Sequence, residues 1–211
     1  MKGNLIIISS PSGGGKGTLI KEVLNTVPDL TCSVSYTTRP IRPGEQDGRE
    51  YFFISREDFE HRRSEGEFLE HATVHGNLYG TSRSQLAHIT ESGRDVILEI
   101  DVQGANQILE KVGDVVSIFI LPPSFPVLAS RLTMRATESS GELNLRLRNA
   151  FIEVKEYEKF KYVVINEFLE AAANDLRIII RAERLRTGRR MDVIQGILDG
   201  FDLSKHQLPG D

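Results

Sequence analysis

Residues 5–18 read Leu-Ile-Ile-Ile-Ser-Ser-Pro-Ser-Gly-Gly-Gly-Lys-Gly-Thr, and this stretch decides the fold. Its apolar half indicates a short buried strand, and the helical pattern of residues 19–24 follows its glycine-rich half. Strand, loop and helix in this order form the context that a phosphate-binding loop requires. Glycines at positions 13, 14 and 15 permit positive φ, so that successive backbone N–H groups can point at an anion. The helix adds its unpaired N–H groups and the positive end of its dipole, and Lys16 adds a point charge. These features favour nucleotide phosphate binding over a flexible glycine turn at the surface.

The loop departs from the usual pattern G-x-x-x-x-G-K-[ST] at two positions. Ser10 replaces the first glycine, and Gly17 replaces the residue whose hydroxyl binds Mg²⁺. A hydroxyl comes one residue later, as Thr18, and Gly-Lys-Gly-Thr resembles the loop of adenylate kinases, which hold the metal mostly through phosphates and water. Mg²⁺ keeps several waters and binds phosphate oxygens, so this arrangement is chemically reasonable. Thr18 is the candidate metal contact, and the sequence leaves open how the metal is held.

Composition limits the classes of function. The chain has 211 residues, enough for one domain with insertions, and is 39% hydrophobic and 27% charged. Its net charge of −4 disfavours a protein that follows a nucleic-acid backbone. Cys32 is the only cysteine, so no internal disulfide forms; its neighbours predict a small, buried strand residue. No apolar run is long enough for a secretion signal or a membrane span, so we expect a cytoplasmic protein that binds neither membrane nor nucleic acid.

Apolar runs alternate with helical patterns along most of the chain. Strands are predicted at Leu5–Ser9, Val96–Ile100, Val115–Leu121 and Tyr162–Ile165, all short and rich in Val and Ile, as in a parallel sheet covered on both faces. Helices are predicted over residues 17–26, 82–92, 102–111, 124–134, 143–159, 168–187 and 191–199. This alternation predicts an α/β fold with a doubly wound parallel sheet.

Two stretches interrupt the alternation. Residues 35–81 carry short alternating runs and turns, and predict a small antiparallel or mixed insertion. Residues 131–150 are polar and rich in arginine and predict a mobile flap between two helices. We therefore expect a core of about residues 1–34, 82–125 and 151–205, an insertion over about 35–81 and a lid over about 126–150.

Several ordered motifs name a family. They are residues 33–45 (Ser-Val-Ser-Tyr-Thr-Thr-Arg-Pro-Ile-Arg-Pro-Gly-Glu), 48–53 (Gly-Arg-Glu-Tyr-Phe-Phe), 68–71 (Phe-Leu-Glu-His), 76–81 (Gly-Asn-Leu-Tyr-Gly-Thr), 98–104 (Leu-Glu-Ile-Asp-Val-Gln-Gly) and 120–124 (Ile-Leu-Pro-Pro-Ser). Together with the phosphate loop they closely resemble the guanylate kinase family from about residue 4 to about residue 190. The resemblance implies a P-loop NTPase fold and Mg²⁺-dependent transfer of the γ-phosphoryl group of ATP to GMP or dGMP in purine metabolism.

The resemblance also implies the residues that bind GMP. It implies that the phosphate of GMP is bound by Arg39, Arg42, Tyr51 and Tyr79. Guanidinium groups and phenols are suitable donors to phosphate oxygens. Glu70 would accept the two N–H groups on the Watson–Crick edge of guanine, which adenine lacks. Further expected GMP contacts are the hydroxyls of Ser35 and Thr81 and the carboxylate of Asp101, which either meets guanine or organises water around Mg²⁺.

The donor side follows in the same way. The ATP-binding residues implied are Ser12, Gly13, Gly14, Gly15, Lys16, Gly17 and Thr18 of the loop, with Arg131, Arg135 and Asn166. The residues implied in catalysis are Lys16, Arg39, Arg135 and Arg146, since cationic groups stabilise the charge of phosphoryl transfer. The sequence departs from the family at Ala136, where glycine is usual, at Ser140–Gly141, where an acidic pair is usual, and at Glu99, where aspartate is usual.

Two other functions compete with this interpretation. A kinase of another monophosphate or of a ribose phosphate would share the loop, but Glu70 with Ser35 and Thr81 argues against it. A binding module that takes up partner peptides would share the fold, but such modules typically lack the loop lysine and glycines that stand at 13, 15 and 16. The sequence leaves open whether the protein is a monomer or a homo-oligomer.

Overall fold

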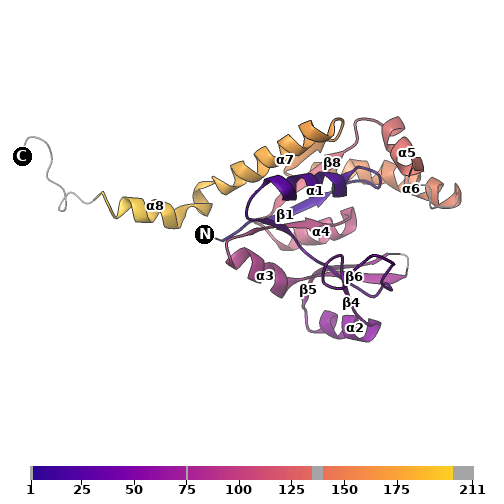
Figure 1. The fold of residues 1–211 in the computed structure, drawn as a ribbon, viewed down its shortest axis with the longest axis horizontal. Helices are drawn as coiled ribbons and strands as arrows, with labels where there is room; N and C mark the ends of the chain where they lie inside the picture. The colour runs from indigo at the N-terminus through magenta and orange to yellow at the C-terminus, as the bar shows by residue number, and fades with distance from the viewer. Residues whose placement is uncertain (1, 75, 135–139, 202–211) are drawn as a thin grey trace, which may run out of the picture.

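A computed structural model of the chain describes residues 2–74, 76–134 and 140–201, except for the side chains of residues 140 and 142. Its centre is a five-stranded, all-parallel sheet (Figure 1). The strands lie in the order β2 (Leu30–Cys32), β7 (Asp95–Glu99), β1 (Leu5–Ser9), β8 (Val116–Leu121) and β9 (Tyr162–Ile165). The four apolar runs thus formed the predicted parallel strands, which confirms the α/β fold class.

Helices cover both faces of this sheet because successive strand residues point to opposite faces. Ile6 and Ile8 of β1 pack in a cluster with α1 (Lys16–Thr26) and α7 (Leu169–Arg184), whereas Ile7 packs with the residues of α3 (Arg83–Glu91) and α4 (Val102–Lys111). All three isoleucines have no exposed surface. The burial of residues 6–9 of β1 explains why its sequence has no polar alternation.

A second, four-stranded sheet lies beside the core, at the lower right of Figure 1. Its order is β4 (Phe52–Phe53), β3 (Tyr36–Thr37), β6 (Asn77–Ser82) and β5 (Phe68–Val74). β6 is antiparallel to β3 and β5, but β3 and β4 are parallel, so the sheet is mixed.

The insertion also holds a helix that the sequence analysis missed, α2 (Arg56–Ser64). Ser55 caps it by accepting a hydrogen bond from the backbone N–H of Asp58 at 3.0 Å. Phe59 is its only fully buried residue, and its ring stacks on Phe68 with centroids 4.5 Å apart. One buried side chain in a short helix leaves no periodic apolar pattern to detect.

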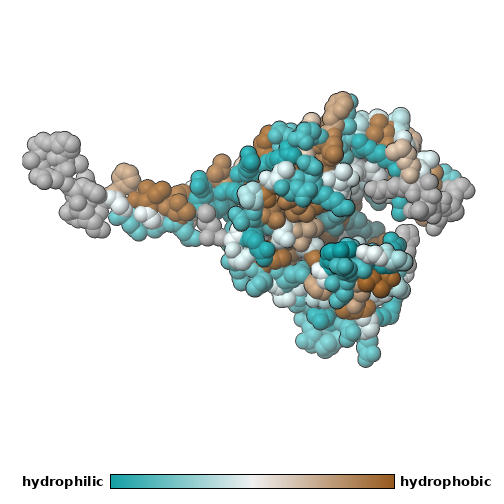
Figure 2. Space-filling view, in the orientation of Figure 1, coloured by the Kyte–Doolittle hydropathy of each residue, from teal (hydrophilic) through white to brown (hydrophobic). Residues whose placement is uncertain are grey.

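The remaining elements follow β8 and β9. They are α5 (Phe125–Met134), α6 (Ser140–Glu153), the 3₁₀ helices η1 (Val154–Lys159) and η2 (Thr187–Arg189), and α8 (Met191–Leu198). The predicted helix over 143–159 is therefore α6 continued by a tighter 3₁₀ segment. α8 extends away from the body, and its apolar side chains are exposed (Figures 1 and 2). None of the helices in the described ranges has the length and apolar character needed to cross a membrane.

Two residue predictions need correction. Cys32 is in a strand as expected, but it is only half-buried, since β2 lies at the edge of the core sheet and lines a cavity. Gly13 and Gly15 adopt positive φ, of 84° and 88°, but Gly14 does not. Gly14 is required for space instead, because a Cβ there would lie 2.8 Å from the Cβ of Ser10.

Candidate functional site

The phosphate loop joins the carboxyl end of β1 to the first residue of α1. Gly15 occupies the N-cap of α1 in the left-handed conformation, and Lys16 is the first helical residue. No side chain caps this helix, so the backbone N–H groups of its first turn remain directed at the space in front of the loop. The sequence therefore produces the anion-binding geometry predicted for it.

The side chain of Lys16 extends from α1 to the carboxyl end of β7. Its ammonium group donates a hydrogen bond to the carbonyl oxygen of Ile100 at 2.8 Å and lies 4.0 Å from Oε1 of Glu99. Burial lowers the pKa of this amine, while the charges of Glu99 and Asp101 oppose that change. The cation is thus held next to the loop by groups that a phosphate can replace.

Arg131 and Asn166 meet on the other side of the loop. The side-chain amide of Asn166 donates to the carbonyl oxygen of Gly14 at 2.9 Å, and Arg131 donates through Nη2 to the carbonyl oxygen of Asn166 at 2.9 Å. Nη1 of Arg131 is buried without a hydrogen-bond partner. These residues line a cavity of about 480 Å³ together with Gly13, Gly15 and Thr18. An unpartnered guanidinium N–H beside a phosphate loop is a ready donor for an anion.

A cavity of about 260 Å³ lies between the insertion sheet and the end of β7. Five of the predicted GMP-binding residues line it: Ser35, Tyr51, Glu70, Tyr79 and Asp101. Tyr51 and Tyr79 meet edge to face with centroids 5.7 Å apart. Side chains that are 66 residues apart in sequence, from Ser35 to Asp101, thus converge on one space.

Glu70 is the buried carboxylate of this cavity. Only 5% of it is exposed, and Thr81 donates to its Oε1 at 2.6 Å. Thr81 lies 3.4 Å from the hydroxyl of Ser35, so the three predicted guanine-binding residues form one chain of contacts. Burial raises the pKa of Glu70, and the hydrogen bond from Thr81 partly opposes this. Its second oxygen, Oε2, has no hydrogen bond among those described and is available to a ligand.

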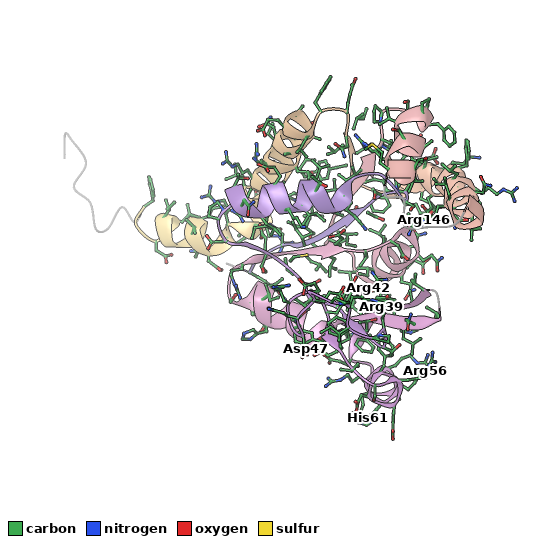
Figure 3. The ribbon with its side chains drawn as sticks, turned by 45° about the vertical axis from the view of Figure 1, so that its right-hand side comes forward. Arg39, Arg42, Asp47, Arg56, His61 and Arg146 are labelled. Atoms are coloured by element: carbon green, nitrogen blue, oxygen red, sulfur yellow. The ribbon has the colours of Figure 1, made fainter. Side chains whose placement is uncertain are left out.

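Arg39 and Arg42 occupy the rim of the insertion, close together in Figure 3. The guanidinium of Arg39 lies over the ring of Tyr51, 5.5 Å from its centroid, and pairs with Glu45 at 2.7 Å. The backbone N–H of Arg42 donates to the same carboxylate, while its side chain is exposed. Neither arginine lines the cavity of Glu70, but Arg39 contacts Tyr51, which does.

A larger cavity, of about 680 Å³, lies below the phosphate loop. It shares Ser35, Tyr51 and Glu99 with the cavity of Glu70 and also contains Lys16. A molecule bound against Glu70 can therefore extend toward Lys16.

Glu99 lies beside the glycine at position 17. A Cβ on Gly17 would lie 3.3 Å from Oε1 of Glu99, so the carboxylate is next to the residue that replaces the usual hydroxyl. Thr18 lines the cavity of Arg131 instead, so its hydroxyl does not lie where the hydroxyl of the usual residue 17 would be. Carboxylate oxygens at the end of β7 suit a hard cation such as Mg²⁺. No group of three or more His, Cys, Asp or Glu side chains that could hold a metal occurs among the described residues.

The lid arginines are only partly within the described residues. Arg146 is half-buried on α6 (Figure 3), whereas Arg135 and Ala136 lie outside the described ranges. Asp101 caps α4 by accepting a hydrogen bond from the backbone N–H of Gly104 at 2.8 Å, while also lining the cavity of Glu70.

Four residues that line the cavity of Glu70 were not among the predicted site residues: Ala72, Val74, Glu99 and Ile100. Ala72 and Val74 follow Glu70 at intervals of two along β5, so the period of a strand places them on the same face. That alternation was the signal that could have found them. Ile100 gave no signal, since its neighbours Glu99 and Asp101 carry the recognisable charges.

Comparison with known proteins agrees with this geometry. The sequence model of the family described as Guanylate kinase matches residues 2–183. The chain belongs to the guanylate kinase family. It is 47% identical to the guanylate kinase of Thermotoga maritima over 196 residues, covering 92% of this chain and 94% of the relative. It is 46% identical to the guanylate kinase of Nitrosospira multiformis, covering 93% of each chain.

A solved structure supports the same family. The crystal structure of the guanylate kinase from Anaplasma phagocytophilum superimposes with a TM-score of 0.71 at 38% identity and covers 89% of each chain. The guanylate kinase match includes both sheets, the phosphate loop and Asn166, and ends within α7. η2 and α8 therefore lie beyond the part that the family model describes.

Proposed function

We propose that the two cavities beside Lys16 hold the two substrates of the family's reaction, and that the residues named above divide its steps. As a member of the guanylate kinase family, the chain transfers the γ-phosphoryl group of ATP to GMP, giving ADP and GDP. The observation that carries the assignment of sites is the buried carboxylate of Glu70, aligned by Thr81 at 2.6 Å, in a cavity that opens toward the phosphate loop.

The guanine of GMP would bind in the cavity of Glu70. The carboxylate would accept N1–H and the 2-amino group, with Ser35 and Thr81 as hydroxyl partners. Adenine would leave the buried charge unpaired, and sites of this kind reject an analogue by about 10⁴–10⁵-fold. Nothing in this set requires the 2′-hydroxyl, so dGMP is expected to be used as well. Arg39, Arg42, Tyr51 and Tyr79 would hold the monophosphate at the rim, and Arg39 would exchange Glu45 for it.

ATP would bind across the phosphate loop. Backbone N–H groups of residues 13–18 and the ammonium of Lys16 would hold its phosphates, Arg131 would donate its unpartnered N–H, and Asn166 would face the adenosine. Mg²⁺ neutralises charge on the β- and γ-phosphates when it is bound. Glu99 and Asp101 would hold its water shell, and Thr18 remains a candidate contact.

Transfer requires positioning and cationic stabilisation more than covalent chemistry by the protein. Lys16 would leave the carbonyl of Ile100 and follow the transferred group, while Arg39, Arg135 and Arg146 would stabilise the charge on its oxygens. Three units follow from these roles: the core, the insertion over about 35–81, and a lid over about 126–150 that excludes water. The single free Cys32 suits a cytoplasmic enzyme that forms no internal disulfide.

The test is ADP release from ATP and Mg²⁺ by the purified chain with GMP, dGMP, AMP, CMP, UMP or dTMP as acceptor. Turnover is expected with GMP and dGMP alone. Lys16→Ala is expected to lower kcat by at least about 10³-fold, because it removes a cation that acts in the transition state. Turnover with AMP at a similar kcat/KM, or near-normal activity of Lys16→Ala, would contradict the proposal.

A further inference from the structure

Glu153 makes a contact that the reaction described above does not use. It is the last residue of α6, and its Oε2 accepts a hydrogen bond from the backbone N–H of Ser12 at 2.9 Å. The two residues are 141 positions apart in the sequence. A negative charge beside a loop that binds polyphosphate opposes ligand binding, so the contact needs a compensating role.

The bonded amide lies at the beginning of the phosphate loop. Ser12 precedes Gly13, and the next turn is closed by a hydrogen bond from the N–H of Gly14 to the carbonyl of Pro11 at 2.9 Å. Apart from the N–H of Gly14, the amides from residue 13 to the first turn of α1 are left for the anion. An acceptor at Ser12 therefore fixes the entry of the loop without occupying the amides that bind phosphate.

The helix that holds Glu153, α6, also holds Arg146. Arg146 precedes Glu153 by seven residues, which is close to two helical turns, so both side chains lie on one face of α6. α6 packs on α5 through Leu128, Leu132 and Ala150. Apolar packing of this kind is not directional, whereas a hydrogen bond fixes the register of a helix against its partner.

A second polar contact holds the segment that follows. Glu156 of η1 accepts a hydrogen bond from the side-chain amide of Asn106 on α4 at 2.9 Å. Glu153 and Glu156 line one cavity of about 300 Å³ with Asp101 and Asn106. The carboxyl end of α6 is thus connected to α4 by Glu156 and to the phosphate loop by Glu153.

We propose that Glu153 is a positioning residue that sets α6, and with it Arg146, relative to the phosphate loop. This inference rests on the proposed function, in which Arg146 stabilises the transferred phosphoryl group. This role requires a side chain long enough to bring an acceptor oxygen to the N–H of Ser12. It does not require the negative charge.

Three substitutions separate reach from charge. Glu153→Gln keeps the length and an acceptor oxygen and removes the charge. Glu153→Asp keeps the charge but is one methylene shorter, so it no longer reaches the N–H of Ser12. Glu153→Ala removes both. Glu158→Ala is the control, since this exposed carboxylate nearby accepts from Tyr157 alone among the residues that the structure describes.

The measurement is kcat and KM for ATP and for GMP, with the unfolding temperature of each variant. Glu153→Asp and Glu153→Ala are expected to lower kcat by about 10–100-fold, the scale of a 1 Å displacement in a catalytic site. KM for GMP is expected to stay within about twofold, because the acceptor cavity is built by other elements. Glu153→Gln and Glu158→Ala are expected to remain within about threefold of the parent chain.

Each alternative outcome is decisive. A loss in Glu153→Gln with near-normal activity of Glu153→Asp would assign the effect to charge and overturn the proposal. Equal losses in the two variants would show that reach alone does not suffice and would also overturn it, as would full activity of Glu153→Ala. If Glu153→Ala does not fold, the comparison of Gln with Asp still decides. If the parent chain does not phosphorylate GMP, the proposed function fails; ATP titrations of the same variants then test Glu153, with weaker ATP binding expected for Asp than for Gln.

Discussion

At the scale of single residues, specificity for guanine depends on one buried carboxylate. Glu70→Gln keeps the shape of the side chain but exchanges one acceptor for a donor, which would face a donor of guanine. We expect kcat/KM for GMP to fall by about 10²–10³-fold and KM for ATP to change by less than about twofold. Steady-state kinetics with each substrate varied in turn checks this, with Glu65→Gln, exposed on the same insertion, as the control. An equal loss for both substrates would exclude Glu70 as the guanine reader.

The pH dependence of the same residue has a definite sign. Burial raises the pKa of Glu70 above its usual value. Only the ionised carboxylate accepts two N–H groups, so kcat/KM for GMP is expected to decline on the acid side at a higher pH than an ordinary glutamate would give. Glu70→Gln is expected to lose this acid limb. A pH profile of kcat/KM that keeps the limb in Glu70→Gln would assign it to another group.

The structure brings five of the predicted site residues to one cavity: Ser35, Tyr51, Glu70, Tyr79 and Asp101. Their roles in binding GMP stay a prediction. The contacts that Arg39 and Lys16 make without substrates were not predictable from sequence. Arg39 pairs with Glu45, and Lys16 with the carbonyl of Ile100, through contacts that depend on loop conformation.

At the scale of elements, the β1–α1 loop depends on both backbone conformation and space. Gly15 has φ of 88°, and a Cβ there would lie 2.3 Å from Nδ2 of Asn166. Gly44, in the insertion, has φ of 86° and open space around it. An alanine at position 44 therefore measures the free-energy cost of positive φ without a steric clash. Gly44→Ala is expected to cost about 1–2 kcal/mol. Gly15→Ala is expected to cost more and to abolish ATP binding, as measured by denaturant unfolding and nucleotide titration. Normal ATP binding by Gly15→Ala would contradict the loop assignment.

Element predictions depended on how much of each element is buried. β1 and β9 were predicted with the bounds that the structure has, because both are continuous apolar runs. β1 is covered on both faces, whereas β9 lies at the sheet edge with Val163 and Ile165 exposed. α2 was missed because it buries only Phe59, and its one sequence signal was Ser55 followed by Asp58. The parallel pairing of β3 with β4 was beyond prediction, since strands of two residues carry no register information.

At the scale of the whole molecule, stability and function occupy opposite ends of the same strands. The carboxyl ends of β1 and β7 carry the phosphate loop and Glu99, as expected for a parallel α/β sheet. At the amino end of β7, Asp95 is 97% buried, since only 3% of its side chain is exposed. It accepts from the backbone N–H of Asn4 at 2.6 Å and pairs with Arg184 of α7 at 2.7 Å. These contacts connect β1, β7 and α7 far from the substrates.

Asp95→Ala therefore tests whether the two ends act independently. It removes the buried partner of Arg184, which is 29% exposed and keeps its hydrogen bonds to the carbonyls of Pro28 and Asp29, so the cost is expected at the lower end of the about 3–5 kcal/mol of a broken buried pair. In a chain of this size that corresponds to a fall of about 10 °C in unfolding temperature. Asp114→Ala is the matched control, because Asp114 pairs with Arg189 at the surface, where ion pairs contribute about 0–1 kcal/mol. Below its unfolding transition Asp95→Ala is expected to keep kcat/KM for GMP within about threefold. A large loss of kcat/KM in the folded variant would show that the amino end of the sheet also sets the geometry of the phosphate loop.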